Sequence, residues 1–226
     1  MESNLEQRPF GNAEFAENPE NRCPVLLLLD TSGSMQGPPI TELNEGLQLF
    51  RDELFADSLA AKRVEVSIVS FGPVKVQADF TGIQYFQAPM LAASGDTPMG
   101  AAIEQGLELL HRRKDIYKAN GISHYRPWIF LITDGGPTDS VIRAAQLVKE
   151  GEDKKKFMFC AVGVDNANMD NLKAISVRDP VKLKGLRFRD LFKWLSASIS
   201  SVSRSRPDET VPLTSPVGLN GWATTE

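Results

Sequence analysis

Cysteine and histidine are scarce in this chain, with two of each among 226 residues. The two cysteines, Cys23 and Cys160, are too few for a disulfide scaffold and form no CxxC pair. Both lie in or beside apolar runs, so we expect buried, reduced thiols. His111 and His124 belong to no recognisable Ser/His/Asp or metal-ligand arrangement, and we interpret both as surface residues.

Long hydrophobic runs and phosphate-binding loops are also absent. The longest aliphatic run, Val25 to Leu29, is far shorter than the roughly 20 residues of a membrane-spanning helix. Residues 1–22 are polar and acidic, without the basic and apolar stretches of a signal peptide. No GxxxxGKS, GxxxxGKT or GxGxxG motif supports nucleotide binding, and the net charge of −4 argues against coating nucleic acid. We therefore expect a cytoplasmic protein without a membrane or nucleic-acid partner.

Charge is unevenly distributed along the chain. Residues 1–60 contain 11 acidic and 3 basic side chains, whereas residues 173–206 contain 9 basic and 2 acidic ones. Solvated helix faces explain such a pattern, and a patch that binds an anionic partner is the alternative.

Apolar patterning predicts alternating strands and helices. Short apolar runs bounded by turn signals predict strands at 24–30, 62–71, 73–80, 128–133 and 157–163. Apolar residues three and four apart predict helices at 41–55, 99–113, 140–150, 169–175 and 187–203. Residues 114–126 are expected to connect a helix to the next strand across the surface.

This alternation predicts a three-layer, doubly wound α/β fold with a mostly parallel central sheet and one antiparallel edge strand. The length suits one well-buried core. We divide the chain into an irregular segment 1–22, a domain 23–205 and an extended C-terminal tail 206–226. Trp222 in this tail docks either on its own domain or on a partner.

Several polar residues are predicted to cap helices or loops. Thr41 is placed to cap the first helix, and Thr138 with Asp139 to cap the helix at 140–150. Asp96 is interpreted as a loop-capping residue. Thr97, taken alone, is equally well explained as a helix cap.

Polar residues follow the predicted strands where ligands bind in open parallel sheets. Asp30, Ser32 and Ser34 alternate directly after one strand, Thr97 precedes a long helix, and Asp134 follows another strand. Hydroxyl and carboxylate oxygens suit Mg²⁺, Mn²⁺ or Ca²⁺ rather than zinc. Asp30, Ser32 and Ser34 are therefore candidate ligands of a divalent metal, at the edge of the sheet where Thr97 and Asp134 are also expected.

The order Asp30-x-Ser32-x-Ser34, a distant Thr97 and then Thr133-Asp134-Gly135 resembles the metal-ion-dependent adhesion site of von Willebrand factor type A (vWA) domains. The resemblance covers roughly residues 22–205 and implies the Rossmann-like vWA fold. Three stretches, Asp30 to Met35, Gly95 to Gly100 and Trp128 to Gly135, resemble those of the bacterial vWA group associated with tellurium-resistance gene clusters. That group is tied to stress response and is often accompanied by protein phosphatase and kinase partners.

The resemblance also implies roles for the five residues. Ser32 and Ser34 would be direct hydroxyl ligands, Thr97 a direct or water-mediated ligand, and Asp30 and Asp134 ligands through water or directly. With both carboxylates acting through water, the ion would keep most of its charge and attract an external carboxylate. The implied function is a non-enzymatic module that binds a Glu or Asp of a protein partner through its metal.

Two alternatives remain. A strand ending in Asp also opens phosphatases of the haloacid-dehalogenase type, in which a second Asp two residues later acts as acid and base. Ser32 stands at that second position and cannot perform this proton transfer at neutral pH. The other alternative is a structural scaffold with a vestigial site, in which the triplet from Asp30 to Ser34 merely caps a loop.

Overall fold

A computed structural model describes residues 15, 17–165, 167–207, 209–217 and 221–224. The seven strands are β1 (Cys23–Asp30), β2 (Val64–Phe71), β3 (Lys75–Gly82), β4 (Trp128–Thr133), β5 (Met158–Gly163), β6 (Val181–Leu183) and β7 (Ala223–Thr224). The helices are η1 (Gly33–Met35), α2 (Pro38–Ala56), α3 (Ala60–Arg63), α4 (Met99–Ala119), α5 (Ile142–Asp153), α6 (Met169–Ile175) and α7 (Phe188–Arg204). Within these described residues, no helix is both long and apolar enough to span a membrane.

The strands form one sheet in the order β3-β2-β1-β4-β5-β6-β7. The five central strands are parallel, and β1 pairs with β2 along its whole length and with β4 on its other side. The chain leaves β1 toward β2 and later returns to the opposite side of β1, which makes the carboxyl ends of β1 and β4 the switch point of the sheet. The predicted doubly wound α/β fold is confirmed.

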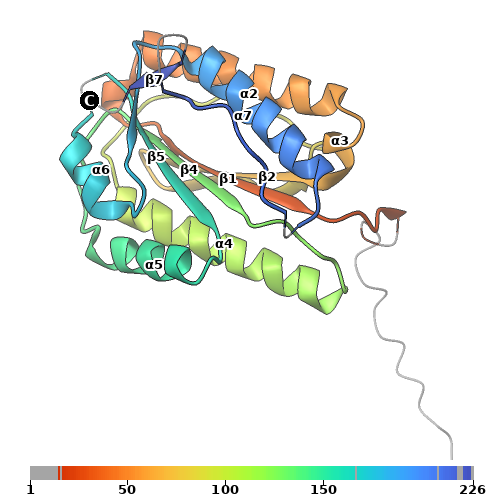
Figure 1. Cartoon of the computed structure of the whole chain (residues 1–226). Helices are drawn as coiled ribbons and strands as arrows, with labels where there is room; N and C mark the ends of the chain where they lie inside the picture. The colour runs from red at the N-terminus through yellow and green to blue at the C-terminus, as the bar shows by residue number, and fades with distance from the viewer. Residues whose placement is uncertain (1–14, 16, 166, 208, 218–220, 225–226) are drawn as a thin grey trace, which may run out of the picture.

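Helices cover both faces of the sheet, as Figure 1 shows, with α2 and α7 on one face and α4 and α5 on the other. Alternate residues of β1 contribute to the two cores: Val25, Leu27 and Leu29 pack with α2 and α7, whereas Leu26 and Leu28 pack with α4 and α5. A strand buried on both faces explains why this run is continuously apolar.

Both edges of the sheet are antiparallel. The predicted edge strand is β3, which pairs with β2 through register shifts around Ile68. The second is β7, which pairs with β6; neither β6 nor β7 was predicted, because strands of three and two residues leave little periodic signal. In the segment interpreted as an extended tail, Trp222 is buried with its ring 5.6 Å from that of Trp194. The tail therefore docks on its own domain.

Two predicted boundaries are corrected. Helix α2 begins at Pro38, so Thr41 is not its cap; it lies in the first turn, where its hydroxyl donates to the Gly37 carbonyl. Helix α4 continues to Ala119 instead of ending at residue 113. Tyr117 is buried in the last turns of this helix. Because its side chain carries a hydroxyl, the apolar periodicity was not recognised beyond residue 113.

The two histidines differ in their surroundings. His111 is exposed, as predicted. His124 is half-buried with its ring 5.3 Å from that of Tyr117, so its interpretation as a surface residue was wrong. Burial lowers the pKa of His124, and nearby Lys114 adds to this effect. Cys23 and Cys160 are free thiols, and only Cys23 is fully buried.

Candidate metal site

Asp30 ends β1 with a completely buried side chain. One of its oxygens accepts a hydrogen bond from the Ser32 amide at 2.8 Å, and the other accepts one from the Thr133 hydroxyl at the end of β4. Burial raises the pKa of Asp30 above its ordinary value of 3.8, the bonds from Ser32 and Thr133 partly offset this, and the charge of Asp134 raises it further. The site is thus built around a carboxylate whose charge is costly.

The hydroxyls of Ser32 and Ser34 lead from the Asp30 carboxylate to Asp134, which follows the neighbouring strand β4. Their oxygens lie 3.0 Å apart, and the Ser34 hydroxyl donates to Asp134 at 2.7 Å. The short helix η1 begins at Gly33, which keeps both serines on the compact loop after β1. Residues 100 positions apart in the sequence are therefore brought into direct contact at the switch point.

Thr97 lies beside these residues, on the loop before α4, and is buried. Its hydroxyl oxygen lies 3.6 Å, and that of Ser34 4.0 Å, from the position that a Cβ on Gly135 would occupy. The two hydroxyls therefore flank the same point above the end of β4. All five predicted residues therefore lie close together at the carboxyl ends of β1 and β4.

The loops that carry the site are held against one another by their backbones. The Gly33 amide donates to Gly95 at 3.0 Å, and the Ser94 amide donates to Thr31 at 2.7 Å. Gly72 has a φ of +147°, and a Cβ there would lie 2.5 Å from the Thr31 carbonyl oxygen. A side chain at Gly72 would therefore displace the loop that follows Asp30.

The donor set fits a hard divalent cation. It combines two carboxylates with three hydroxyls, which are ligands that Mg²⁺, Mn²⁺ and Ca²⁺ accept. Because only two acidic groups take part, the site is not a cluster of three or more His, Cys, Asp or Glu side chains, and the described residues contain no such cluster elsewhere. Among the described residues, no Lys or Arg forms an ion pair with Asp30 or Asp134.

The sequence missed two supporting roles. Thr133, which was seen only as part of a Thr-Asp-Gly stretch, donates to Asp30. Asp139 was predicted to cap the helix at 140–150, but it accepts hydrogen bonds from the Gly100 and Ala101 amides of α4. Contacts between segments so far apart leave no local pattern. Asp96 is exposed beside the site.

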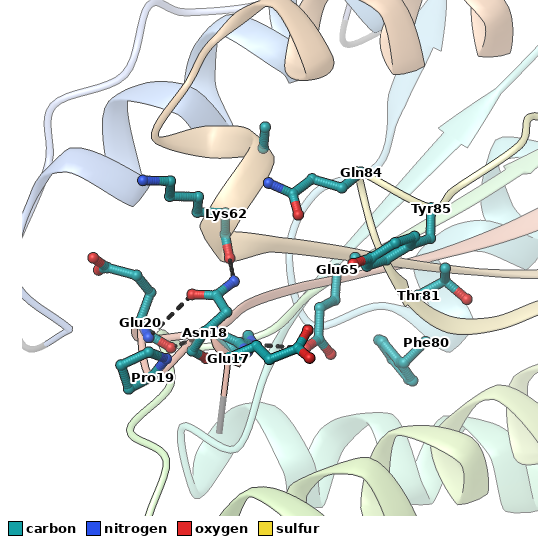
Figure 2. Close-up of a pocket in the computed structure, with 13 residues that line it drawn as sticks. Glu17, Asn18, Pro19, Glu20, Lys62, Glu65, Phe80, Thr81, Gln84 and Tyr85 are labelled. Atoms are coloured by element: carbon teal, nitrogen blue, oxygen red, sulfur yellow. Dashed lines mark hydrogen bonds and ion pairs between the residues drawn. The ribbon is translucent and has the colours of Figure 1, made fainter. Parts of the chain in front are cut away.

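A large cavity lies at the other end of the sheet, with a volume of about 650 Å³. Figure 2 shows the side chains of Asn18, Lys62, Phe80 and Tyr85 around it and Glu65 at its inner wall. The carboxylate of Glu65 accepts hydrogen bonds from Arg22, Arg113 and Tyr117. None of the five predicted metal ligands lines this cavity.

Comparison with known proteins identifies the family. The model of the von Willebrand factor type A domain matches residues 25–184, which include all five residues of the site. The chain belongs to the vWA family. Domains of this family are protein-interaction and adhesion modules, and they often bind a divalent metal at a metal-ion-dependent adhesion site.

Two curated relatives match part of the vWA domain. The inter-alpha-trypsin inhibitor heavy chain H1 of Bos taurus is 24% identical over 143 residues, and heavy chain H4 of Sus scrofa is 27% identical over 148 residues. Each match covers 60% of this chain but 15% of the relative. The chain therefore aligns with only a small part of these proteins.

Solved structures share the fold. The vWF domain of the type V pili tip protein Mfa5 from Porphyromonas gingivalis has a TM-score of 0.57 and 11% identity, covering 84% of this chain and 99% of that one. The pilus adhesin SpaC from Lactobacillus rhamnosus GG, in its open conformation, has a TM-score of 0.64 and 14% identity, covering 80% and 30%. At these identities the likeness concerns the vWA fold alone.

Proposed function

We propose that this vWA domain binds Mg²⁺, with Mn²⁺ or Ca²⁺ as substitutes, through Asp30, Ser32, Ser34, Thr97 and Asp134, and that the bound metal captures a Glu or Asp of a protein partner. The metal would supply a positive charge and an open coordination position for that carboxylate. The protein would act as a non-enzymatic interaction module.

One observation carries this proposal: the continuous contact from Ser32 through Ser34 to Asp134 beside the buried Asp30. The contact between Ser34 and Asp134 joins two loops from different strands. A buried carboxylate without a basic partner is costly, and a cation removes that cost. The domain's own residues thus prepare a place for positive charge that the described side chains do not fill.

Each residue has a distinct task in this proposal. Ser32 and Ser34 present their hydroxyl oxygens from the loop after β1, and Thr97 presents its hydroxyl from the loop before α4. Asp30 and Asp134 supply negative charge without surrounding the ion completely. If both carboxylates bind through water, a divalent cation keeps most of its positive charge, which favours a further carboxylate from outside.

Metal binding is tested directly by titrating the full chain with Mn²⁺ and following the free ion by electron paramagnetic resonance. We expect one ion per chain, with affinity weakened about tenfold or more in Ser34→Ala and Asp134→Asn. The matched controls are Ser201→Ala on α7 and Asp153→Asn at the end of α5, which leave the site intact. Equal affinity in all four variants would refute the proposed ligand set, and the lack of any binding would favour a vestigial site.

The geometry weighs against the phosphatase alternative. A nucleophilic carboxylate must reach its substrate, whereas Asp30 is fully buried with both oxygens engaged. Such an enzyme needs a second carboxylate at position 32 to act as acid and base. The residue there is Ser32, whose hydroxyl contacts that of Ser34. Hydrolysis of an aryl phosphate with Mg²⁺, lost in Asp30→Asn, would establish the phosphatase instead.

We further propose a cytoplasmic role in a bacterial stress-response or phospho-signalling system related to tellurium resistance, with a protein phosphatase or kinase of the same gene cluster as partner. The resemblance of the Asp30, Gly95 and Trp128 stretches supports this context. The test is binding of each purified gene-cluster protein to the chain with Mg²⁺ and with EDTA. Binding that needs Mg²⁺, and that is lost when one acidic residue of the partner is neutralised, is the expected result. Binding unaffected by EDTA would contradict it.

A further inference from the structure

The donors of the proposed metal site come from two parts of the structure, which must keep a fixed distance from each other. Asp30 ends β1, Ser32 and Ser34 lie on the loop after it, and Asp134 directly follows β4. The two loops are joined by the bond between Ser34 and Asp134. Thr97 belongs to the loop before α4. Its place relative to Asp134 therefore depends on how α4 is held against the loop after β4.

Two adjacent residues of the loop after β4 hold α4 and Thr97 in place. The Thr97 amide donates to the Thr138 hydroxyl at 3.1 Å, and the Thr138 amide donates back to the Thr97 carbonyl at 2.9 Å. The Asp139 carboxylate accepts the Gly100 amide at 2.9 Å and the Ala101 amide at 2.8 Å. Four hydrogen bonds thus connect a five-residue stretch, 97–101, to two neighbouring side chains and one amide.

Helix α4 depends on this contact because its own sequence supplies no cap. Its N-cap position is Pro98, which forms no side-chain capping bond, and its first turn has no acidic residue. Asp139 replaces that cap from a distant part of the chain, and its negative charge faces the positive end of the helix dipole. The carboxylate therefore fixes the start of α4, two residues after Thr97.

The packing between the two segments is tight enough to transmit position. A Cβ on Gly100 would lie 2.3 Å from the Ser140 carbonyl oxygen, so only glycine permits this approach. On the other side of the contact, a Cβ on Gly135, the residue after Asp134, would lie 3.6 Å from the Thr97 hydroxyl oxygen. A shift of the 138–140 segment would therefore move Thr97 relative to Asp134.

We propose that Asp139 is a positioning residue for the metal site, acting on metal affinity through Thr97 without touching the metal. This inference rests on the proposed function. Residues that orient metal ligands typically contribute roughly 10- to 100-fold to affinity. Asp139 has this effect because it fixes the α4 end from which Thr97 projects.

The test is a double-mutant cycle on Mn²⁺ affinity, using the full chain and Mn²⁺ as the probe. We expect Asp139→Ala to weaken affinity about tenfold and Asp139→Asn, which retains one acceptor oxygen, to weaken it about threefold. Thr97→Ala weakens affinity on its own. The double variant Thr97→Ala/Asp139→Ala binds Mn²⁺ no more weakly than Thr97→Ala, because Asp139 then has no ligand left to position.

A matched control separates positioning from general destabilisation. The Asp57 carboxylate accepts the Leu59 and Ala60 amides at 3.1 Å each near the start of α3, and it also pairs with Arg204. Asp57→Ala removes at least as many contacts as Asp139→Ala, but away from the proposed metal site, and leaves Mn²⁺ affinity within twofold of the wild type. Thr138→Val, which removes the acceptor for the Thr97 amide, repeats the loss seen with Asp139→Ala.

The outcomes are distinct. Wild-type affinity in both Asp139 variants and in Thr138→Val overturns the inference while the metal site stands. Additive losses in the double variant also overturn it, because Asp139 then acts independently of Thr97. Absence of Mn²⁺ binding by the wild type overturns the proposed function itself.

Discussion

Asp30 and Glu65 are buried carboxylates at opposite ends of the paired parallel strands β1 and β2, with 0% and 1% of their surface exposed. Glu65 receives hydrogen bonds from Arg22 at 2.9 Å, from Arg113 at 2.7 and 2.8 Å, and from the Tyr117 hydroxyl. Asp30 receives one amide and one hydroxyl. One end of the sheet neutralises its carboxylate within the chain, and the other does not.

The difference separates a carboxylate that is paired within the chain from one that, under the proposed function, is left for an external ion. Around Glu65, two guanidinium groups more than balance one carboxylate, and the guanidinium carbon of each lies 5.1 Å from the centre of the Phe15 ring. Around Asp30, the charge that acts on its pKa is that of another carboxylate, Asp134. A buried charge must be paired, protonated or matched by an external ion. The first solution serves stability, and the last makes stability depend on a ligand.

The largest predicted effect breaks the neutralised end. Glu65→Ala removes the carboxylate between two buried guanidinium groups, and we expect a loss of about 3–5 kcal/mol in the free energy of unfolding, measured with urea. Where Glu65→Ala does not fold, Glu65→Gln retains an acceptor and shows a smaller loss. A change below about 1 kcal/mol in both variants would contradict the structural role of this cluster.

Some of this contrast was predictable from sequence, and some was not. The alternation of strands and helices and the spacing of Asp30, Ser32 and Ser34 after an apolar strand are both local patterns. The fold and this part of the candidate site were therefore predicted. Glu65 is the only charged residue of strand β2, and its partners Arg22 and Arg113 lie 43 and 48 residues away. Nothing in the local pattern links them, and the same applies to the contact of Asp139 with α4.

The second predicted effect tests whether the other end accepts an external cation. With Mg²⁺ at 100 times its dissociation constant, the free energy of unfolding rises by about 2.7 kcal/mol. The same increment is expected in Glu65→Gln, because the two ends are independent. In Asp134→Asn, whose affinity is at least about tenfold weaker, the increment falls to about 1.4 kcal/mol or less at the same Mg²⁺ concentration. Thermal unfolding with Mg²⁺ and with EDTA measures it. An equal increment in Asp134→Asn would place the ion elsewhere.

The third effect concerns the uncompensated Asp30 in the metal-free protein. Burial raises the pKa of Asp30 in the folded state, so the folded protein binds more protons than the unfolded chain between pH 3.8 and the raised pKa. The contribution of Asp30 to the free energy of unfolding therefore falls as the pH rises from 3.8 through the raised pKa. Asp30→Asn removes this dependence. In EDTA we expect the variant to match the wild type below pH 3.8 and to be more stable than the wild type at neutral pH. Urea unfolding of both proteins across this range measures the difference, and a less stable variant at neutral pH would contradict it.

The smallest effect uses the thiols to compare how the two ends open. Burial raises the pKa of Cys23 to about 12, with Arg63 lowering it and Glu65 raising it, and burial likewise raises the pKa of Cys160 to about 12. At pH 8 roughly one thiol in ten thousand is then ionised, so iodoacetamide should label neither in the native wild type, as intact mass would show. Glu65→Gln weakens the packing at the end of the sheet where β1 begins. In this variant we expect Cys23 to be labelled faster than Cys160, and we expect EDTA to leave this order unchanged. Faster labelling of Cys160 than of Cys23 in that variant would show that the amino end does not open on its own.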